Sequence, residues 1–316
     1  MAASFHTPVL CHTVLEMLVT TRHGIYVDAT LGGGGHSAAL LRKLSPVARV
    51  IGIDRDANAL KAANERLAAM SNFTALHGRF GNLGTLLKNQ SVRQIDGLLL
   101  DLGVSSHQLD CAPRGFSHRH KATPDMRMDQ QTGAPADKLI NEWPLKTLEK
   151  TLFTWGEEPQ ARRIARAIVA ARPVRSTTEL AAIIRGASPV RHEAKAVARV
   201  FQAIRIAVNG EMDELEAVLR QAPELVKIGG RLVVVSYHSL EDRRVKRMIR
   251  HGNLAGEPWR DLYGRSLSPW RALLRKPVTA SEDEVLSNPR ARSARLRAAE
   301  RVRTPDSSRK HPKPYI

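Results

Sequence analysis

The sequence predicts an α/β fold in which a parallel β-sheet is covered by helices on both faces and interrupted by an inserted all-helical subdomain. Short, nearly continuous apolar segments alternate with helical segments in the first third of the chain. A long later block shows helical signals alone before one more apolar strand follows. Three of the predicted strands also end in an aspartate, and this regularity indicates a ligand site.

The first third of the chain reads as strand and helix in alternation. Residues 24–29 form a short apolar strand, and a glycine cluster joins it to a helix at 36–44. Residues 49–54 form a second strand, which a strongly helical segment at 57–70 follows. Residues 96–101 form a further strand. Parallel strands connected by helices are buried on both faces, which explains why these strands are apolar throughout.

Asp28, Asp54 and Asp101 stand at the carboxyl ends of these three strands. The carboxyl ends of parallel strands lie along one edge of the sheet, and ligands bind beyond that edge. We therefore expect these carboxylates to border a ligand site.

The pattern changes in the middle of the chain. Residues 109–134 are polar and contain glycine and proline, whereas residues 135–208 carry only helical signals. Strand character returns at 230–236. A helical block between two strands of one sheet is best explained as an insertion.

These signals predict three parts of the chain. Residues 1–108 and 210–302 form the sheet domain, and residues 109–209 form an inserted helical subdomain that recognises the substrate. Residues 303–316 are basic and rich in proline and serine, so we expect a disordered tail.

The composition is strongly basic. Lysine and arginine number 49 against 31 aspartates and glutamates, which gives a formal net charge of +18. An excess of this size favours and accelerates contact with a polyanion. Arginine outnumbers lysine, and its planar guanidinium suits phosphates and base edges. Charge alone also fits a solvated basic surface, so a nucleic-acid partner needs further support.

Cysteine and hydrophobic patterns predict the compartment. Cys11 and Cys111 have no paired spacing, which excludes a disulfide framework and a CxxC metal site. The apolar stretch at residues 8–19 is interrupted by polar side chains, so it is not a signal peptide, and no apolar run approaches the length of a membrane span. No metal-ligand cluster stands out among the 12 histidines. We expect a cytoplasmic protein without a membrane partner or a bound metal.

The glycine cluster at residues 32–35 predicts a cofactor site. Glycines at a strand-to-helix turn let the backbone approach a ligand closely, and the start of the helix adds free N–H groups. Asp54 follows at the spacing where a carboxylate accepts the ribose hydroxyls of an adenosine.

Two cofactor classes use such a turn. A nicotinamide enzyme needs G-x-G-x-x-G, but Ser37 occupies the third glycine position counted from Gly32. S-adenosylmethionine carries an ammonium and a sulfonium and no phosphate, so the acids Asp28 and Asp101 would suit it and would repel a pyrophosphate. The acids favour S-adenosylmethionine.

Eleven short blocks, spread over nearly the whole chain, resemble the bacterial ribosomal RNA small subunit methyltransferase H family (RsmH, also called MraW). Each block is weak alone, but their order and spacing together are highly specific. In chain order they are residues 6–10 (HTPVL), 32–36 (GGGGH), 53–56 (IDRD), 100–106 (LDLGVSS), 108–110 (QLD), 114–117 (RGFS), 125–129 (DMRMD), 154–158 (TWGEE), 201–206 (FQAIRI), 236–243 (SYHSLEDR) and 288–293 (NPRARS).

The resemblance implies a class I (Rossmann-like) S-adenosylmethionine-dependent methyltransferase sheet with an inserted helical subdomain. It implies methyl transfer to the exocyclic N4 of a specific cytidine in the decoding region (P site) of 16S rRNA, which gives N4-methylcytidine. The partner would be 16S rRNA. Free rRNA and the assembled small subunit both remain open as the substrate, with the subunit favoured because a single cytidine must be found by shape as well as by sequence, and the sequence leaves a monomer and a homodimer open. The cofactor contacts that the resemblance implies are Gly34, Gly35, His36, Asp54, Phe80, Asp101 and Gln108.

The chemistry at N4 needs an in-line geometry and an acceptor for the amine proton. Many amino-directed methyltransferases carry Asp/Asn-Pro-Pro-aromatic after the fourth strand, but residues 101–106 read DLGVSS here. The candidate catalytic residues are therefore Asp101, Ser105 and Ser106, and we expect positioning to matter more than a dedicated base.

Two further segments have more than one interpretation. Tyr237 or His238 could stack on or hydrogen-bond an extruded base, whereas Ser239 could simply cap a helix. The alternating charges of residues 125–129 could order on RNA or cap the insertion.

A set of arginines could bind phosphate. Three of them fall on one side of a predicted helix at 161–171, opposite its apolar side. The set comprises Arg162, Arg163, Arg166, Arg172, Arg175, Arg185, Arg191 and Arg199.

Three other functions compete with RNA methylation. A nicotinamide oxidoreductase conflicts with the missing glycine and with the acid pair. A non-catalytic RNA-binding protein conflicts with the intact glycine turn and the strand-tip acids. Methylation of DNA or protein is disfavoured by the resemblance alone.

Overall fold

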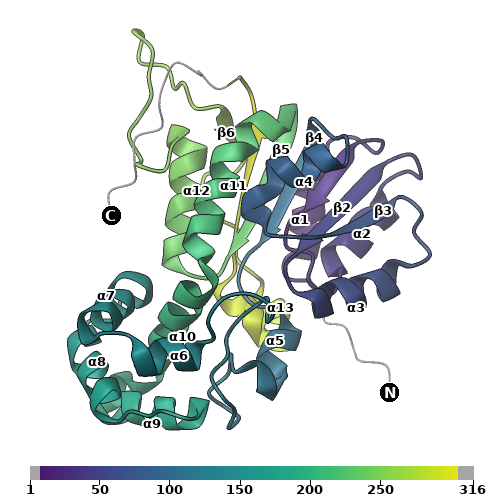
Figure 1. Ribbon diagram of the computed structural model, residues 1–316. Helices are drawn as coiled ribbons and strands as arrows, with labels where there is room; N and C mark the ends of the chain where they lie inside the picture. The colour runs from purple at the N-terminus through teal and green to yellow at the C-terminus, as the bar shows by residue number, and fades with distance from the viewer. Residues whose placement is uncertain (1–7, 305–316) are drawn as a thin grey trace. The chain divides into compact units, whose positions relative to one another are not determined.

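The computed structural model describes residues 8–304, which divide into two compact units (Figure 1). The described residues of unit 1 belong to Met1–Gly103 and Asp213–Ile316, and unit 2 is Val104–Met212. The sequence analysis placed the ends of the insertion at residues 109 and 209, a few residues inside this division. Most of the expected tail, from residue 305 onward, lies outside the described residues.

Unit 1 contains a seven-stranded sheet with the order β3-β2-β1-β4-β5-β7-β6. The strands from β1 to β5 run parallel to their neighbours, as predicted. The sheet is mixed, however, because β7 is antiparallel to both β5 and β6. The strands are β1 Ile25–Asp28, β2 Arg49–Asp54, β3 Phe73–His77, β4 Ile95–Asp101, β5 Val226–Ser236, β6 Trp270–Ala272 and β7 Arg295–Arg301.

The last two strands were not foreseen, and β5 is longer than expected. The β7 sequence, RLRAAER, consists of residues that favour helices, and only its pairing with β5 makes it extended. In β5, Gly229 has a positive φ of 82°, and the register with β4 shifts at this point. The glycine pair 229–230 therefore marks a bulge inside the strand rather than a turn before it.

Helices bury both faces of the sheet in unit 1. Alternate residues of each strand join opposite cores, as the two-residue period of a strand requires: Val27 and Val234 pack with α4, α11 and α12, whereas Tyr26 and Val233 pack with α1 and α2. Figure 1 shows α4, α11 and α12 on one face. The helices are α1 Cys11–Leu18, α2 Gly35–Lys43, α3 Ala57–Leu67, α4 Leu83–Asn89, α11 Glu211–Leu225, α12 Ser239–His251 and α13 Glu282–Ser287.

Unit 2 is helical and has its own apolar core. The long helix α10 carries one side of this core, including Val197, Val200 and Ile204, against the other helices (Figure 1). The helices are α5 Ser106–Asp110, α6 Ala136–Glu142, α7 Leu145–Gly156, α8 Ala161–Ala170, α9 Thr177–Gly186 and α10 Glu193–Asn209. Within residues 8–304, no helix has the length and apolar character that crossing a bilayer requires.

Candidate active site

Three aspartates end three adjacent parallel strands, as the sequence predicts. Asp54 closes β2, Asp28 closes β1 and Asp101 closes β4, and these strands are neighbours in the sheet. The carboxyl edge of unit 1 therefore carries a row of acids. Their surroundings give each acid a different chemistry.

Asp28 is a structural acid. Only 1% of its surface is exposed, and its carboxylate accepts hydrogen bonds from Ser37 Oγ at 2.8 Å and from Thr30 N at 3.3 Å. Burial raises the pKa of Asp28, although His36 and these hydrogen bonds act in the opposite direction. The carboxylate of Asp28 is enclosed by the turn that follows it, and the expectation that its charge suits a cationic cofactor stays a prediction.

The glycine turn joins β1 to α2, and two of its glycines adopt the left-handed backbone conformation. Gly32 has φ 51° and Gly34 has φ 74°, a region that side chains with a Cβ rarely adopt. Gly34 is the N-cap residue of α2, and no side chain caps this helix end. The first N–H groups of α2 are thus available to a ligand beside the carboxyl edge.

Asp54 is tied to this turn. Its Oδ2 accepts a hydrogen bond from Gly32 N at 2.8 Å, and its Oδ1 accepts one from Asp56 N at 2.8 Å. Burial raises the pKa of Asp54 to about 6, against the lowering effect of these two bonds. A carboxylate oxygen has two lone pairs, so each one keeps room for a ligand hydroxyl.

His36 is a buried cation in the first turn of α2. Its Nε2 lies 3.3 Å from Asp101 Oδ2, and 6% of its side chain is exposed. Burial alone would lower the pKa of His36, but Asp101, the Cys11 thiol and the Asp28 carboxylate raise it to about 10. The sequence marked His36 as a contact residue without indicating this charge, which depends on three other segments.

Asp101 is more exposed than its neighbours Asp28 and His36, with 22% of its side chain exposed against 1% for Asp28 and 6% for His36. Tyr237, which directly follows β5, donates its hydroxyl to Asp101 Oδ1 at 2.8 Å. Burial, together with Asp101 and Glu241, raises the pKa of Tyr237, so the phenol keeps its proton. The Asp101 N–H donates to Thr30 Oγ1 at 2.6 Å. Asp101 is thus held rigidly while part of its carboxylate faces solvent.

The sequence analysis named Tyr237 only as a possible base-stacking residue and missed its bond to Asp101. The two residues are 136 positions apart, and they meet because β5 pairs with β4. The signal that could have found this bond is that Tyr237, like Asp101, comes at the carboxyl end of a strand.

The start of α12 differs from the expectation. His238, not Ser239, is the N-cap residue, and Glu241 occupies the third helical position. Glu241 Oε2 accepts hydrogen bonds from Tyr237 N at 2.8 Å and from His238 N at 3.3 Å. An acid in the first turn can satisfy the free N–H groups that precede a helix, so Ser239 was not needed as the cap.

Phe80 opens a short 3₁₀ turn, Phe80–Asn82, just after β3. Its ring is half-buried and packs against the core that contains Ile53. Phe80 therefore follows the strand next to that of Asp54, at the carboxyl side of the sheet.

The remaining predicted site residues belong to unit 2. Ser105 is the N-cap residue of α5, and its Oγ accepts from Gln108 N at 3.2 Å while Gln108 Oε1 accepts from Ser105 N at 2.9 Å. Gln108 is 5% exposed, and Ser106 is the first residue of the helix. The hydroxyl of Ser105 therefore caps helix α5. The catalytic roles of Ser105 and Ser106 and the cofactor contact of Gln108 stay predictions.

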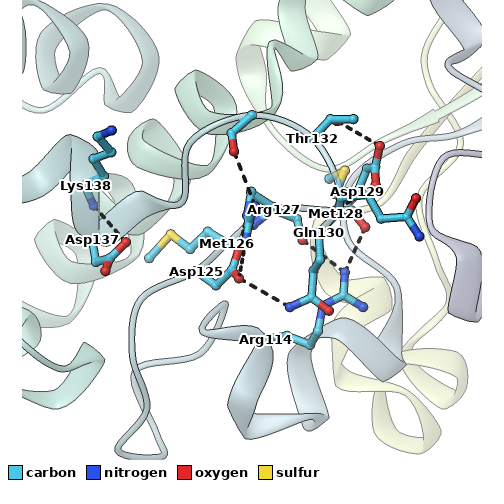
Figure 2. Close-up of polar contacts among 12 residues, drawn as sticks. Arg114, Asp125, Met126, Arg127, Met128, Asp129, Gln130, Thr132, Asp137 and Lys138 are labelled. Atoms are coloured by element: carbon cyan, nitrogen blue, oxygen red, sulfur yellow. Dashed lines mark hydrogen bonds and ion pairs between the residues drawn. The ribbon is translucent and has the colours of Figure 1, made fainter.

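The loop at residues 125–132 is held by its own polar contacts (Figure 2). Arg127 donates from Nε and Nη2 to the two carboxylate oxygens of Asp125, at 2.8 and 2.9 Å. Burial raises the pKa of Asp125, but the bonds from Arg127 have the larger combined effect and lower it. The buried Arg114 donates to the carbonyl groups of Arg127 and Met128 at 3.0 and 2.9 Å.

Asn209, the last residue of α10, fixes the centre of this loop. Its side chain donates to Met126 O at 2.7 Å and accepts from Met128 N at 2.8 Å. Met126 is fully buried with φ 58°, a strained conformation that such contacts must maintain. The sequence block containing Asp125 and Arg127 thus forms a rigid loop within unit 2. The sequence alone did not predict that Asn209 holds this loop through hydrogen bonds to its backbone.

The expected arginine set divides into two kinds. Arg162, Arg163 and Arg166 of α8 are exposed, as predicted, and Arg175, Arg185 and Arg191 are exposed as well. Two members have structural partners instead. Arg172 donates to the carbonyl groups of Ile140 and Trp143 at 2.8 and 2.6 Å, and Arg199 lies 3.6 Å from the Glu158 carboxylate.

Comparisons with known proteins identify the family of the chain. The model of the MraW methylase family matches residues 3–302. A protein of Heliobacterium modesticaldum is 45% identical over 312 residues, which cover 94% of this chain and 99% of that protein. A protein of Flavobacterium johnsoniae is 42% identical over 303 residues, covering 94% and 98%. A protein of Sorangium cellulosum is 46% identical over 303 residues, covering 94% and 91%.

All three relatives carry the name ribosomal RNA small subunit methyltransferase H. The family match spans both units and every predicted site residue. The chain therefore belongs to the MraW methylase family and is a methyltransferase.

Proposed function

We propose that this protein transfers a methyl group from S-adenosylmethionine to the exocyclic N4 of a specific cytidine in the decoding region (P site) of 16S rRNA, which gives N4-methylcytidine. The observation that carries the proposal is the acid-bordered glycine turn at the carboxyl edge of unit 1, where Asp54 and the rigid Asp101 flank the uncapped start of α2. The names of the relatives supply the substrate class, ribosomal RNA of the small subunit.

The residues of this edge fit the cofactor. Asp54 would accept the ribose hydroxyls through its remaining lone pairs, and Phe80 would contact the adenine. Gly34, Gly35 and the backbone of His36 bind through the free N–H groups of α2, while Asp101 offers negative charge to the cationic methionine part. The family resemblance adds Gln108 to the proposed contacts. The bound cofactor supplies an electrophilic methyl group.

The protein's contribution to the transfer is to position the target amine and to accept its proton. S-adenosylmethionine would supply the methyl group, and the protein would hold the N4 amine in line with it and accept the proton that the amine loses. The acceptors that we propose are Asp101, Ser105 and Ser106. Of the two serines, Ser106 is the better candidate, because the hydroxyl of Ser105 already caps α5.

The wider setting follows from the substrate. We propose that the partner is 16S rRNA assembled in the small subunit, since a single cytidine must be recognised by shape as well as by sequence. The exposed arginines of unit 2, such as Arg162 and Arg166, would contact its phosphates. The cytoplasm is the compartment in which this substrate is found.

The decisive experiment combines the purified protein, methyl-labelled S-adenosylmethionine and small subunits that lack the modification. We expect label in N4-methylcytidine after digestion to nucleosides. Label in another nucleoside would retain the enzyme class and refute the target atom. Absence of both label and cofactor binding would refute the proposal as a whole.

Asp54→Asn tests the cofactor site. Removing a charged acceptor of two hydroxyls should weaken S-adenosylmethionine binding about 10- to 100-fold, as measured by calorimetric titration. Asp213→Asn, which changes an exposed acid of unit 1, is the matched control and should bind as the wild type does. Equal affinities in both variants would exclude Asp54 from the site.

Ser106→Ala and Ser105→Ala test the proton acceptors. Ser106→Ala should lower turnover and leave cofactor affinity intact, whereas Ser105→Ala should in addition lower the free energy of unfolding by about 1 kcal/mol through loss of the cap. Turnover and urea denaturation of the two variants separate these effects. Unchanged turnover in both would remove the serines from the mechanism.

A further inference from the structure

A β-hairpin extends from unit 1 in the segment between α12 and β6. Leu267 N donates to Trp259 O at 2.8 Å, and Arg260 and Ser266 form an antiparallel bridge. Figure 1 shows the chain between α12 and β6 as an extended excursion. We refer to residues 259–267 as the 259–267 hairpin.

Its tip is fixed by local hydrogen bonds. Asp261 Oδ1 accepts from Tyr263 N at 2.9 Å and from Arg265 N at 2.8 Å, and Asp261 N donates to Arg265 O at 3.0 Å. Gly264 supplies the positive φ of 76° that closes the turn. The tip is thus a defined structure that positions its side chains.

Two apolar side chains at this tip are almost completely exposed. The exposed fraction is 102% for Leu262 and 85% for Tyr263. The guanidinium of Arg265 lies 5.8 Å from the centre of the Tyr263 ring. An aromatic ring held in solvent beside an arginine is the arrangement on which an unstacked base can lie.

A basic cluster surrounds the base of the hairpin. Burial lowers the pKa of His251, and the charges of four nearby cations lower it further. His251 ends α12, so these cations gather at the carboxyl end of that helix. We define the basic cluster as Lys246, Arg247, Arg250 and Arg260, all of them exposed.

We propose that the 259–267 hairpin and the basic cluster form a second RNA-binding surface, on unit 1, in which the cations bind phosphates and Tyr263 stacks on an unpaired base. The inference rests on the rRNA substrate proposed above and names a contact outside the inserted subdomain. Positive charge beside an exposed aromatic ring matches a single-stranded polyanion whose bases have free faces.

The surface contacts RNA away from the target nucleotide. Helix α12 starts two residues after β5 ends at the carboxyl edge, and its 13 residues span about 20 Å. Arg250 and the hairpin that follows this helix are therefore too distant to touch a base placed near Asp101. The surface binds a flanking segment and contributes to affinity and to the choice of site.

The stacking contact is tested with Tyr263→Ala and Tyr263→Phe, using deproteinised 16S rRNA and small subunits as probes. We expect Tyr263→Ala to weaken binding to both probes about 10-fold and Tyr263→Phe to bind as the wild type, because the ring and not the hydroxyl stacks. Leu286→Ala, at another exposed apolar residue of unit 1, is the control and should have no effect. All variants should bind S-adenosylmethionine normally, which shows that they are folded.

The phosphate contacts are tested with the double variant Lys246→Ala/Arg250→Ala. The slope of log affinity against log salt concentration should become shallower by about 1.5, since each lost phosphate contact removes about 0.7 to 0.9. The exposed pair Arg42→Ala/Lys43→Ala is the charge-matched control and should keep the wild-type slope.

Two outcomes would overturn the inference. Wild-type affinity of Tyr263→Ala and of the double variant for both probes would show that the surface does not bind. Weaker binding to the small subunit alone, with normal binding to deproteinised rRNA, would assign the surface to a protein partner. If the wild-type protein itself bound no cofactor or methylated no rRNA, the proposed function would fail, and that result is distinct from either outcome.

Discussion

The three aspartates at the carboxyl edge of the sheet differ in burial and in hydrogen-bond partners, although they are the same amino acid. Asp28, Asp54 and Asp101 occupy equivalent strand ends, yet Asp28 is enclosed, Asp54 binds the glycine turn, and Asp101 is held between His36 and Tyr237. Asp101 is only partly buried, and the protein itself supplies its cationic partner, the buried His36. Of the three acids, Asp28 is closed off, while Asp54 and Asp101 remain partly exposed.

His36 should make stability depend on pH in the alkaline range. Its pKa is raised from 6.5 to about 10, so its contribution is fully present below pH 6.5 and is lost as the pH rises to about 10. Between pH 6.5 and 10 we expect the free energy of unfolding of the wild type to fall more than that of His36→Asn. Urea denaturation followed by circular dichroism at several pH values measures this difference.

The exposed His23 provides the control for this prediction. His23→Asn should follow the wild-type dependence on pH, because this exposed side chain contacts the Ser45 hydroxyl at 2.7 Å rather than a buried carboxylate. Parallel curves for the wild type and His36→Asn would mean that His36 is neutral in the folded protein.

At the scale of elements, the turn between β1 and α2 places backbone N–H groups at the carboxyl edge of the sheet, where we propose that the cofactor binds. Its left-handed glycines let the chain reverse within a few residues while Gly32 N reaches Asp54. Packing adds a second constraint. A Cβ on Gly34 would lie 3.2 Å from Leu67 Cδ1 and 3.3 Å from Ala63 Cβ, both of α3, so this turn also sets how closely α2 and α3 approach.

Gly34→Ala and Gly133→Ala separate these two constraints. Both glycines have φ near 75°, but a Cβ on Gly133 would meet nothing within 4 Å. We expect Gly133→Ala to lower the free energy of unfolding by about 1–2 kcal/mol from backbone strain alone, and Gly34→Ala to lower it by about 2–3 kcal/mol. Urea denaturation gives both values. Equal losses would show that the contacts with α3 are easily relieved.

At the scale of the whole molecule, the positive net charge favours an RNA partner. The net charge of +18 includes the exposed arginines of unit 2 and the basic cluster of unit 1, so positive charge lies on each unit. A protein with such a distribution gains affinity for RNA by releasing the counterions of its phosphates. The cofactor, bound through a few short-range contacts, does not share this source of affinity.

Affinity for 16S rRNA should therefore depend steeply on salt, and affinity for S-adenosylmethionine should not. Between 50 and 200 mM monovalent salt, we expect rRNA binding to weaken about 100-fold or more, because several phosphate contacts are lost together. Cofactor binding should change less than about twofold, since a single small ligand releases few ions. Filter binding and calorimetric titration over one salt series check both. A flat response for rRNA would contradict the electrostatic role of the arginines.

The sequence by itself determined the features that depend on local order along the chain. Apolar segments bounded by turns predicted β1, β2 and β4 with their terminal aspartates, because each strand and the residue after it are adjacent in sequence. Helical periodicity predicted α8 to within one residue, since its apolar stripe repeats over several turns, and it predicted that the block at residues 135–208 is helical. The ordered motif blocks predicted the methylase family.

Tertiary structure decided everything that depends on residues far apart. The strand β7 exists because β5 offers an edge for pairing, although its own residues favour a helix. The charge of His36 depends on Asp101, Asp28 and Cys11, and the rigidity of Asp101 depends on Tyr237 at 136 positions' distance. Strand pairing and burial arise only when distant segments of the chain fold together. A local sequence pattern therefore does not predict which charges and hydrogen-bond partners will surround a buried side chain.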